Sequence, residues 1–472
     1  MEGESRSRSA GLSVHVLLYV LGAVHWLAFL NFGNIPFGLF DWRQEFHYLS
    51  VLKEALVRGV VPYYVKPLIH FTDRFMAPPL SVLAPHIVLL LWVPLRFFEV
   101  FHVLLFYAIG CAGTAAFKAR YGLSWPVYLV FFLLFNFNGY LTSHLCVGHM
   151  VWWAGYYLLP WFFLLMLDWV EKGPSVRTSL LISLVLFVMS LAGSFHFCSW
   201  CMIFICLLGL RKSGWLKYVG LTALASGLLI AYRLAPGSAE FGRLVCGWSA
   251  VGYQSLRDMA AALVALRPPV FPGINAQAWW EYDMYVGFAG ALILLAFGVG
   301  PLLPRVGRSG AWAEYSRLDL PLAGMALLSY GDVYWWVLYG VPVLSVERVV
   351  SRLLIVPLVL VAMLASIRLE ELRKRVILPV RILPWARIAC GAVLLLLAAD
   401  LLRHSWVWRI SALAALFPGA YTPPVPPAIV EGVKDAYSTN VRVGWSVSLI
   451  SLAMIGWVFL MRLLRGERRP RT

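Results

Sequence analysis

Residues 350–367 read VSRLLIVPLVLVAMLASI, and residues 368–375 continue the chain as RLEELRKR. The first segment is apolar almost throughout and approaches the roughly 20 residues that a helix needs to cross a bilayer. The second segment is charged and mainly basic. An apolar run followed at once by a short basic loop is typical of a helix that crosses a membrane and ends on its cytoplasmic side.

The composition extends this pattern to the whole chain of 472 residues. Hydrophobic residues make up 61% of the sequence and charged residues only 13%, whereas a soluble domain carries about 25% charged residues. This excludes a soluble enzyme, and a chain this apolar cannot remain disordered in water. The apolar runs are long and unbroken, unlike the short alternating segments of a transmembrane β-barrel. The sequence therefore predicts an all-α polytopic membrane protein.

The basic residues help to count the crossings. With twelve crossings both termini lie in the cytoplasm, and most of the 39 basic residues fall in short cytoplasmic loops and a basic tail, as the positive-inside rule requires. The net charge of +16 then reflects topology, and we expect no nucleic-acid partner. A short further run, 80–95, would make thirteen crossings. The twelve expected helices are 12–30, 99–117, 125–138, 150–168, 178–193, 196–210, 215–233, 285–304, 318–331, 350–367, 386–402 and 444–463.

This topology divides the chain into two parts. Residues 1–367 form the expected transmembrane core, and residues 368–472 add C-terminal helices and the basic cytoplasmic tail, with no separate soluble domain. Three long external segments, about 31–79, 234–284 and 403–443, hold most carboxylates that could do chemistry. The candidate site is therefore expected on the external face.

The first external loop contains the sequence FDWRQEF at residues 40–46. Apolar residues from Trp42 onward recur at helical spacing until Gly59, which predicts an amphipathic helix on the membrane surface. Asp41 directly precedes this helix. It could be an N-cap, with Gln44 completing a capping box, or a general base that accepts a proton from an incoming hydroxyl.

Three histidines lie near expected helix ends. His144 and His149 flank a turn at Gly148, and His196 follows a helix break at residues 193–194. They could contact a substrate headgroup, or they could anchor the protein at the interface with the aromatic belt. A metal site would need a further ligand, which Asp41 or Glu281 could supply; we expect no certain cofactor, with a divalent metal as an open alternative.

Two further clusters are candidates for substrate contacts. Glu281 and Asp283 lie among Trp and Tyr residues. Carboxylates beside aromatic rings are suited to bind a sugar, but the same residues could form an ordinary aromatic girdle at the membrane interface. Arg348 and Arg352 are four residues apart, so on a helix they would share one face. Two guanidinium groups there could bind a phosphate or pyrophosphate, or simply meet lipid headgroups.

The order of these features resembles the GT-C superfamily of polytopic membrane glycosyltransferases, in particular the bacterial relatives of oligosaccharyltransferases and protein mannosyltransferases. The similar segments are FGLFDWRQEF, NGYLTSHLCVGHM, EYDMYVGFAG and SVERVVSRLL, spread over residues 12–367. The resemblance implies a transfer of sugar from a polyprenyl phosphate or pyrophosphate at the external face. It matches Asp41 to the catalytic acidic residue of the first loop, and Arg348 and Arg352 loosely to a lipid-phosphate contact.

Two departures from the family pattern remain. The chain has His144 and His149 where the family carries a second acidic motif, and it lacks a large C-terminal soluble domain, which leaves a partner subunit open. The resemblance implies a multi-pass protein of a prokaryotic plasma (inner) membrane, with lipid and a polyprenyl-linked donor as partners. The alternatives are a transporter or flippase of lipid-linked glycans, and a non-catalytic membrane scaffold.

Overall fold

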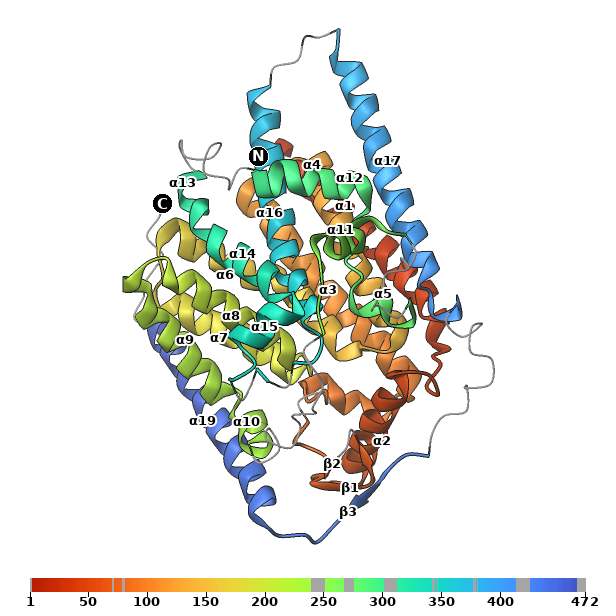
Figure 1. The fold of residues 1–472 in the computed structure, drawn as a ribbon, viewed down its shortest axis with the longest axis vertical. Coiled ribbons are helices and arrows are strands. Elements are labelled where there is room, and N and C mark those ends of the chain that lie inside the picture. The colour runs from red at the N-terminus through yellow and green to blue at the C-terminus, as the bar shows by residue number, and fades with distance from the viewer. Residues whose placement is uncertain are drawn as a thin grey trace.

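The fold was taken from a computed structural model, which describes residues 2–69, 72–78, 81–238, 251–266, 276–300, 312–341, 344–345, 347–376, 379, 381–412 and 425–464. Helices dominate these residues, and one small sheet lies at the lower end in Figure 1. The predicted basic tail beyond Leu464 lies outside the described residues.

In the first half of the chain, the helices from Leu95 onward follow one another through short turns, whereas a longer segment that contains strands separates Leu95 from the helix that ends at Arg58. The helices are α1 (Glu2–Phe29), α2 (Trp42–Arg58), α3 (Leu95–Tyr121), α4 (Trp125–Asn136), α5 (Gly139–Val147), α6 (Met150–Lys172), α7 (Val176–Leu191), α8 (Phe195–Leu210), α9 (Leu216–Leu229) and α10 (Ala231–Gly237). Short 3₁₀ segments, η1 (Asn31–Gly33), η2 (Pro85–Leu91) and η3 (Ser213–Trp215), join some of them.

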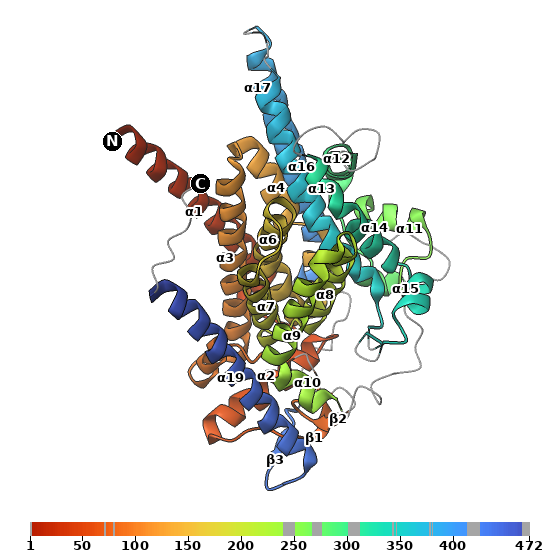
Figure 2. The same ribbon diagram turned by 90° about the vertical axis from the view of Figure 1, so that its left-hand side faces the viewer.

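The second half contains more short helices. They are α11 (Leu256–Val264), η4 (Ala276–Glu281), α12 (Gly287–Ile293), the π-helical η5 (Leu294–Val299), α13 (Trp312–Tyr315), η7 (Ser316–Leu318), α14 (Asp319–Leu328), α15 (Gly331–Val337), η8 (Val350–Leu354), α16 (Ile355–Arg375), α17 (Leu383–Val407) and α19 (Ala436–Leu464). Helices α16 and α17 form the long hairpin at the top of Figures 1 and 2.

Among the residues that the structure describes, seven helical segments are long and apolar enough to cross a membrane, or eight if the bent pair α9 and α10 forms one span. The inner spans Trp125–Val147 and Val350–Arg375 are 94% buried in the protein, whereas the outer spans Leu383–Ala412 and Ala436–Leu464 are only 11% buried. Apolar helices that leave this much of their surface uncovered in the protein require lipid around them. The predicted helical membrane protein is confirmed at this level.

Within the ambiguous run 80–95, the described residues before α3 contribute only η2, a 3₁₀ helix of seven residues. At a rise of about 2 Å per residue η2 spans about 14 Å, less than half of the hydrocarbon core of about 30 Å. This 3₁₀ helix is too short to cross a membrane by itself.

The end of the bundle that carries the α3–α4 and α6–α7 turns is rich in charge pairs. Arg120 bonds to Glu171, which also accepts from Tyr315, and the Ser124 amide donates to Glu370 at 2.8 Å. Arg211 pairs with Asp319 beyond the end of α8. These contacts join the end of α3 to α6 and α13, the start of α4 to α16, and the end of α8 to α14.

The opposite end carries the small sheet, in the order β2–β1–β3. Strand β1 (Tyr64–Ile69) pairs antiparallel with β2 (Thr72–Arg74) and with β3 (Ala428–Val430), and Tyr64 lies opposite Val430. Figure 1 shows β3 beside β1 although it comes from the far end of the chain. The sheet thus joins the first loop to the segment between α17 and α19.

Helix α2 begins at Trp42 and ends at Gly59, as the sequence predicts. Gly59 takes a left-handed conformation (φ 64°), which ends the helix at little steric cost. The apolar side of α2 packs on protein: Tyr48, Leu49 and Leu52 share a buried cluster with Phe98 and Tyr437. The apolar stripe that suggested a membrane-lying helix therefore covers part of the core.

Candidate functional site

The candidate site forms where the start of α2 meets the turn between α5 and α6. Gly148 makes this turn with φ 94°, and a Cβ added there would lie 2.3 Å from the backbone nitrogen of Trp42. The Asp41 amide donates to Val147 O at 3.1 Å, and Trp42 Nε1 donates to Cys146 O at 2.9 Å. This docking fixes Asp41 over the turn that carries His149.

Asp41 and His149 form a close pair, with Oδ2 and Nε2 2.6 Å apart. The Asp41 side chain is 52% exposed and that of His149 only 7%, so the pair joins the surface to the interior. Asp41 makes no capping hydrogen bond through its side chain. Asp41 is therefore the N-cap residue of α2 by position, as one alternative expected, but it forms no capping box with Gln44, and its carboxylate contacts His149.

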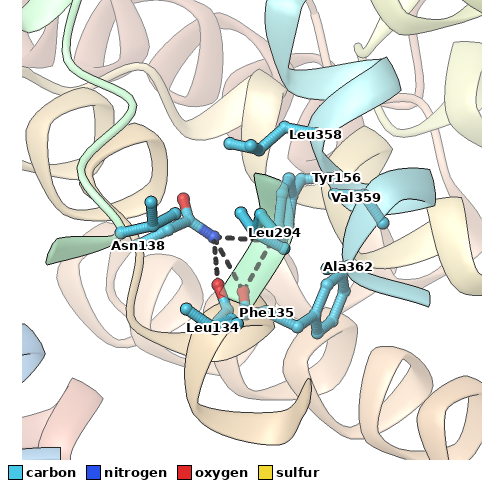
Figure 3. A pocket seen from close by; sticks show the side chains of 9 residues that line it. Leu134, Phe135, Asn138, Tyr156, Leu294, Leu358, Val359 and Ala362 are labelled. Atoms are coloured by element: carbon cyan, nitrogen blue, oxygen red, sulfur yellow. Dashed lines mark hydrogen bonds between the residues drawn. The ribbon is translucent and has the colours of Figure 1, made fainter. Parts of the chain in front are cut away.

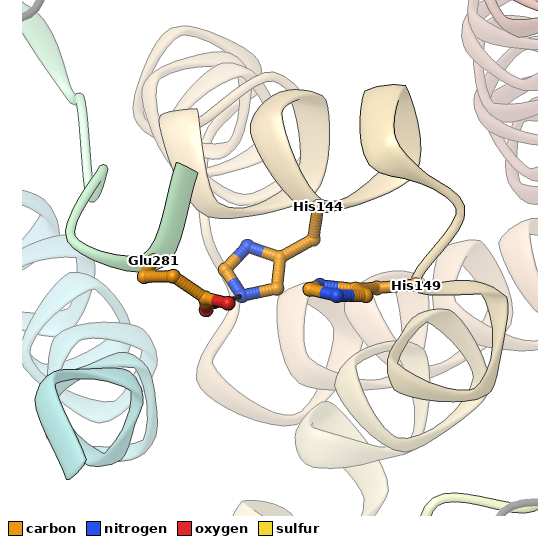
Figure 4. Close-up of side chains that lie close together, drawn as sticks. All are labelled: His144, His149 and Glu281. Carbon is orange, nitrogen blue, oxygen red and sulfur yellow. Dashed lines mark ion pairs between the residues drawn. The ribbon is translucent and has the colours of Figure 1, made fainter. Parts of the chain in front are cut away.

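His144 lies on α5 beneath this pair. Its ring stacks on Tyr140 with centroids 4.2 Å apart, and its centroid lies 5.1 Å from that of His149. Its Nε2 is 3.9 Å from Glu281 Oε2. Figure 4 shows both imidazole rings and the Glu281 carboxylate gathered in one place. The structure thus brings together Asp41, His144, His149 and Glu281, which the sequence could only name separately.

Arg352 closes the inner side of the cluster. It is buried, pairs with Glu281, and places its guanidinium carbon 4.2 Å from the centre of the Trp152 ring. Trp152 in turn stacks on His196 with centroids 4.7 Å apart. A cation over an indole face is a favourable contact, worth up to about 2 kcal/mol when desolvated. His196 and Arg352 therefore belong to the same cluster.

Glu347 is a further carboxylate of this cluster, next to His196. It is buried and pairs with His196 Nδ1 at 2.7 Å, while Trp200 Nε1 donates to it at 3.0 Å. Burial alone would raise the pKa of the Glu347 carboxyl, but His196 and Arg352 outweigh this and hold the pKa below its usual value. Glu347 is therefore a charged member of the cluster.

Arg348 and Arg352 do not share a helix face. Arg348 precedes η8 in extended backbone and is exposed, whereas Arg352 lies within η8 and is buried. Val251 bridges to Val349, and its amide donates to Arg348 O at 2.7 Å, which holds this stretch out of the helix. The expected guanidinium pair is wrong in its geometry, although both residues lie at this end of the bundle.

Asp283 lies apart from the exposed site. It is fully buried, and it accepts from Trp408 Nε1 at 2.6 Å and from the Tyr285 amide at 3.0 Å, with His404 Nε2 2.9 Å away. These partners tie η4 and the segment that follows it to α17. Both oxygens of the Asp283 carboxylate thus have partners within the protein, and the structure does not bring Asp283 into the cluster around Asp41.

A cavity of only about 10 Å³, room for about one water molecule, lies between the end of α4, α6, η5 and α16. Its lining is apolar except for Asn138 and Tyr156 (Figure 3). The Asn138 amide donates to Leu134 O, Phe135 O and Tyr156 Oη, so its donors are satisfied within the wall. The lining contains no charged group, and the cavity does not suit a polar glycan.

Glu45 lies on α2 one turn after Asp41 and is 4% exposed. Burial raises the pKa of its carboxyl well above the usual range, and the charges of Glu99 and Asp41 raise it further. A group whose pKa is raised on folding stabilises the fold fully below its unfolded pKa, about 4.3 for Glu, and this stability is lost as the pH rises through the folded pKa. Glu45 therefore lowers the free energy of unfolding at neutral and alkaline pH.

We expect Glu45→Gln to raise the melting temperature at pH 8 and to change it little at pH 4.5. Glutamine resembles the protonated acid, so it removes the cost of ionising a buried carboxyl. Thermal unfolding in detergent across pH 4.5–8 measures the effect. A variant that melts below the wild type at pH 8 would contradict the expected direction of the change; Glu54→Gln, at an exposed site on the same helix, serves as the control.

Several site features were missed from the sequence. The sequence does not single out Trp152 or Trp200, and only their contacts with Arg352 and Glu347 distinguish them. Comparison of the chain with protein-family models, curated proteins and solved structures finds no match. The function of the protein is therefore inferred from the chemistry and the position of the cluster.

Proposed function

We propose that the protein is a membrane glycosyltransferase that moves a sugar from a polyprenyl phosphate or pyrophosphate to an acceptor hydroxyl at the external face. The observation that carries the proposal is the Asp41–His149 pair, a half-exposed carboxylate held 2.6 Å from a buried imidazole. An acid–base pair at the surface end of a helical membrane protein can take a proton from an acceptor while the lipid part of the donor stays in the bilayer.

The proposed topology has twelve crossings with both termini in the cytoplasm. Beside the seven long spans, it counts the bent pair α9–α10 as one crossing, and it also counts α14 and the shorter apolar helices Val176–Leu191, Phe195–Leu210 and Gly287–Val299. The turns at residues 121–125, 172–176 and 210–216 then lie on one side with the basic residues, which supports a cytoplasmic assignment for that end. The α5–α6 turn and Asp41 lie on the other side.

In the proposed reaction Asp41 accepts the proton of the acceptor hydroxyl. The acceptor oxygen forms a bond to the anomeric carbon of the sugar, and the bond from that carbon to the phosphate oxygen breaks. The electron pair leaves with the lipid phosphate, which needs little further help as a leaving group. His149 holds the Asp41 carboxylate in place and can share its proton.

The donor phosphate is assigned to Arg348, which is exposed beside the cluster. Arg352 lies deeper and is paired with Glu281. Its proposed role is to add positive electrostatic potential on the inner side of the phosphate site. Phe40 and Trp280 approach each other with ring centroids 5.2 Å apart near Asp41, and their faces suit the apolar side of a sugar ring.

The test is to extract lipids from the purified full-length protein and identify them by mass spectrometry. We expect a polyprenyl phosphate or its sugar conjugate at well above the level in the host membrane. Addition of sugar-charged polyprenyl phosphate to the protein in vesicles should then release free polyprenyl phosphate and a glycosylated acceptor. Movement of the intact donor across the bilayer without transfer would favour a transporter and reject the proposal, as would the absence of any polyprenyl lipid.

A further inference from the structure

The ring nitrogens of His144 and His149 and the Glu281 carboxylate include three ligand atoms that all lie within 4.8 Å of one another. Among the described residues, this is the one group of three or more His, Cys, Asp or Glu side chains placed so closely. From this geometry we propose that the group binds a divalent transition-metal ion of the zinc type. The proposal goes beyond the transfer of sugar and does not depend on it.

His144 Nε2 is the first reason. The side chain is only 3% exposed, and Nε2 has no hydrogen-bond partner. The distance of 3.9 Å between His144 Nε2 and Glu281 Oε2 is longer than a hydrogen bond allows. Buried polar atoms are nearly always satisfied by the protein, by water or by an ion. An imidazole nitrogen aimed at a carboxylate across such a gap is what an ion between the two would require (Figure 4).

His149 provides the second nitrogen, and Asp41 orients it. When His149 is neutral, an Nε2–H that donates to Asp41 leaves the lone pair on Nδ1, which is buried and also without a partner. A metal-binding histidine commonly donates its other N–H to a carboxylate, which fixes the tautomer and makes the ligand more basic. Asp41 thus has the position of a residue that supports a metal ligand.

The charges of the cluster favour a divalent cation. Asp41 and Glu281 contribute two negative charges beside the proposed ligands, and Arg352 contributes one positive charge, while Glu347 is paired with His196. The surroundings of the proposed ligands are therefore net negative when His144 and His149 are neutral. A divalent cation is attracted to such a position.

The ligand types select the metal. Two imidazoles and one carboxylate form a known zinc set that leaves a fourth position open, whereas Mg²⁺ and Ca²⁺ prefer oxygen ligands. Bonds of about 2.0–2.1 Å in tetrahedral geometry place ligand atoms about 3.3 Å apart, so the three side chains need only close inward by about 1 Å. Glu281 and both histidines are side chains that can make this adjustment.

The experiment measures zinc on the full chain in detergent, with no substrate present. The protein is stripped with a chelator, equilibrated with Zn²⁺, freed of excess metal and analysed by mass spectrometry for metals. We expect about one zinc per chain, retained in excess Mg²⁺, with X-ray absorption showing two imidazole ligands at about 2.0–2.1 Å. His144→Gln and His149→Gln should each weaken binding at least 100-fold, and Asp41→Ala about 10–100-fold.

The matched control is His86→Gln. His86 also pairs with a second histidine, with His86 Nε2 3.0 Å from His102 Nδ1, but it does not belong to the proposed group. This variant should keep its zinc. The proposal is overturned if the wild type retains no zinc above background, or if His144→Gln elutes as a folded monodisperse protein and binds zinc like the wild type. Sugar transfer can still be measured in either case, so the two proposals fail separately.

Discussion

Asp41→Asn is expected to reduce the rate of sugar transfer by about 10²–10⁴-fold, the usual contribution of a general base, and to leave the fold intact. Asparagine keeps the size of the side chain and can still accept a hydrogen bond from His149, but it cannot take a proton from the acceptor. The side chain of Asp41 makes no capping hydrogen bond to α2, so its loss should not weaken the helix. Turnover of the purified enzyme in vesicles, beside its melting temperature, gives both quantities.

Glu54→Gln is the matched control for this prediction. Glu54 is a carboxylate on the same helix with a similar exposure of 38%, and its partner is Arg58 one turn away. Its neutralisation should leave turnover unchanged. If Asp41→Asn folds and transfers sugar at a rate near that of the wild type, Asp41 is not the base and the proposed mechanism is wrong.

The second large effect is expected from Arg352→Gln, which should lower the free energy of unfolding by about 3–5 kcal/mol. Arg352 is the ion-pair partner of Glu281, whose side chain is only 16% exposed. Removal of the arginine leaves that carboxylate inside the protein without its counter-charge. The double variant Arg352→Gln with Glu281→Gln removes both charges, and we expect it to recover much of the lost stability.

Denaturation in mixed detergent compares the wild type with the two single variants and the double variant as one thermodynamic cycle. Arg348→Gln is the control, because Arg348 is exposed and a surface substitution usually changes stability by less than about 0.5 kcal/mol. Equal losses in Arg352→Gln and in the double variant would show that the arginine stabilises the fold through its packing on Trp152 and not through Glu281.

The sequence was sufficient where local patterning decides the structure. Helix α2 begins and ends at Trp42 and Gly59, as the spacing of apolar residues and the glycine predict. The inner helices likewise follow from their apolar runs. These features depend on neighbours within a few turns, which a single sequence contains.

The sequence was insufficient where distant segments meet. Arg348 and Arg352 were expected on one helix, but the β-branched Val349 favours extended backbone and bridges to Val251. Asp283 looked like an external carboxylate because its burial depends on α17, more than a hundred residues later. The meeting of Asp41 with His149 depends on how α2 docks, and no spacing in the sequence encodes that.

The pairing of β3 with β1 has a consequence for how the protein is made. Ile429 and Tyr437 complete the buried cluster under α2, and both are synthesised long after that helix has reached the membrane. Until residue 430 leaves the ribosome, the apolar side of α2 lacks part of its cover, and the edge of β1 that β3 later occupies is open. The first loop therefore reaches its final packing only after nearly all of the chain has been synthesised. Until then its apolar side and its open strand edge are exposed to non-native pairing and aggregation.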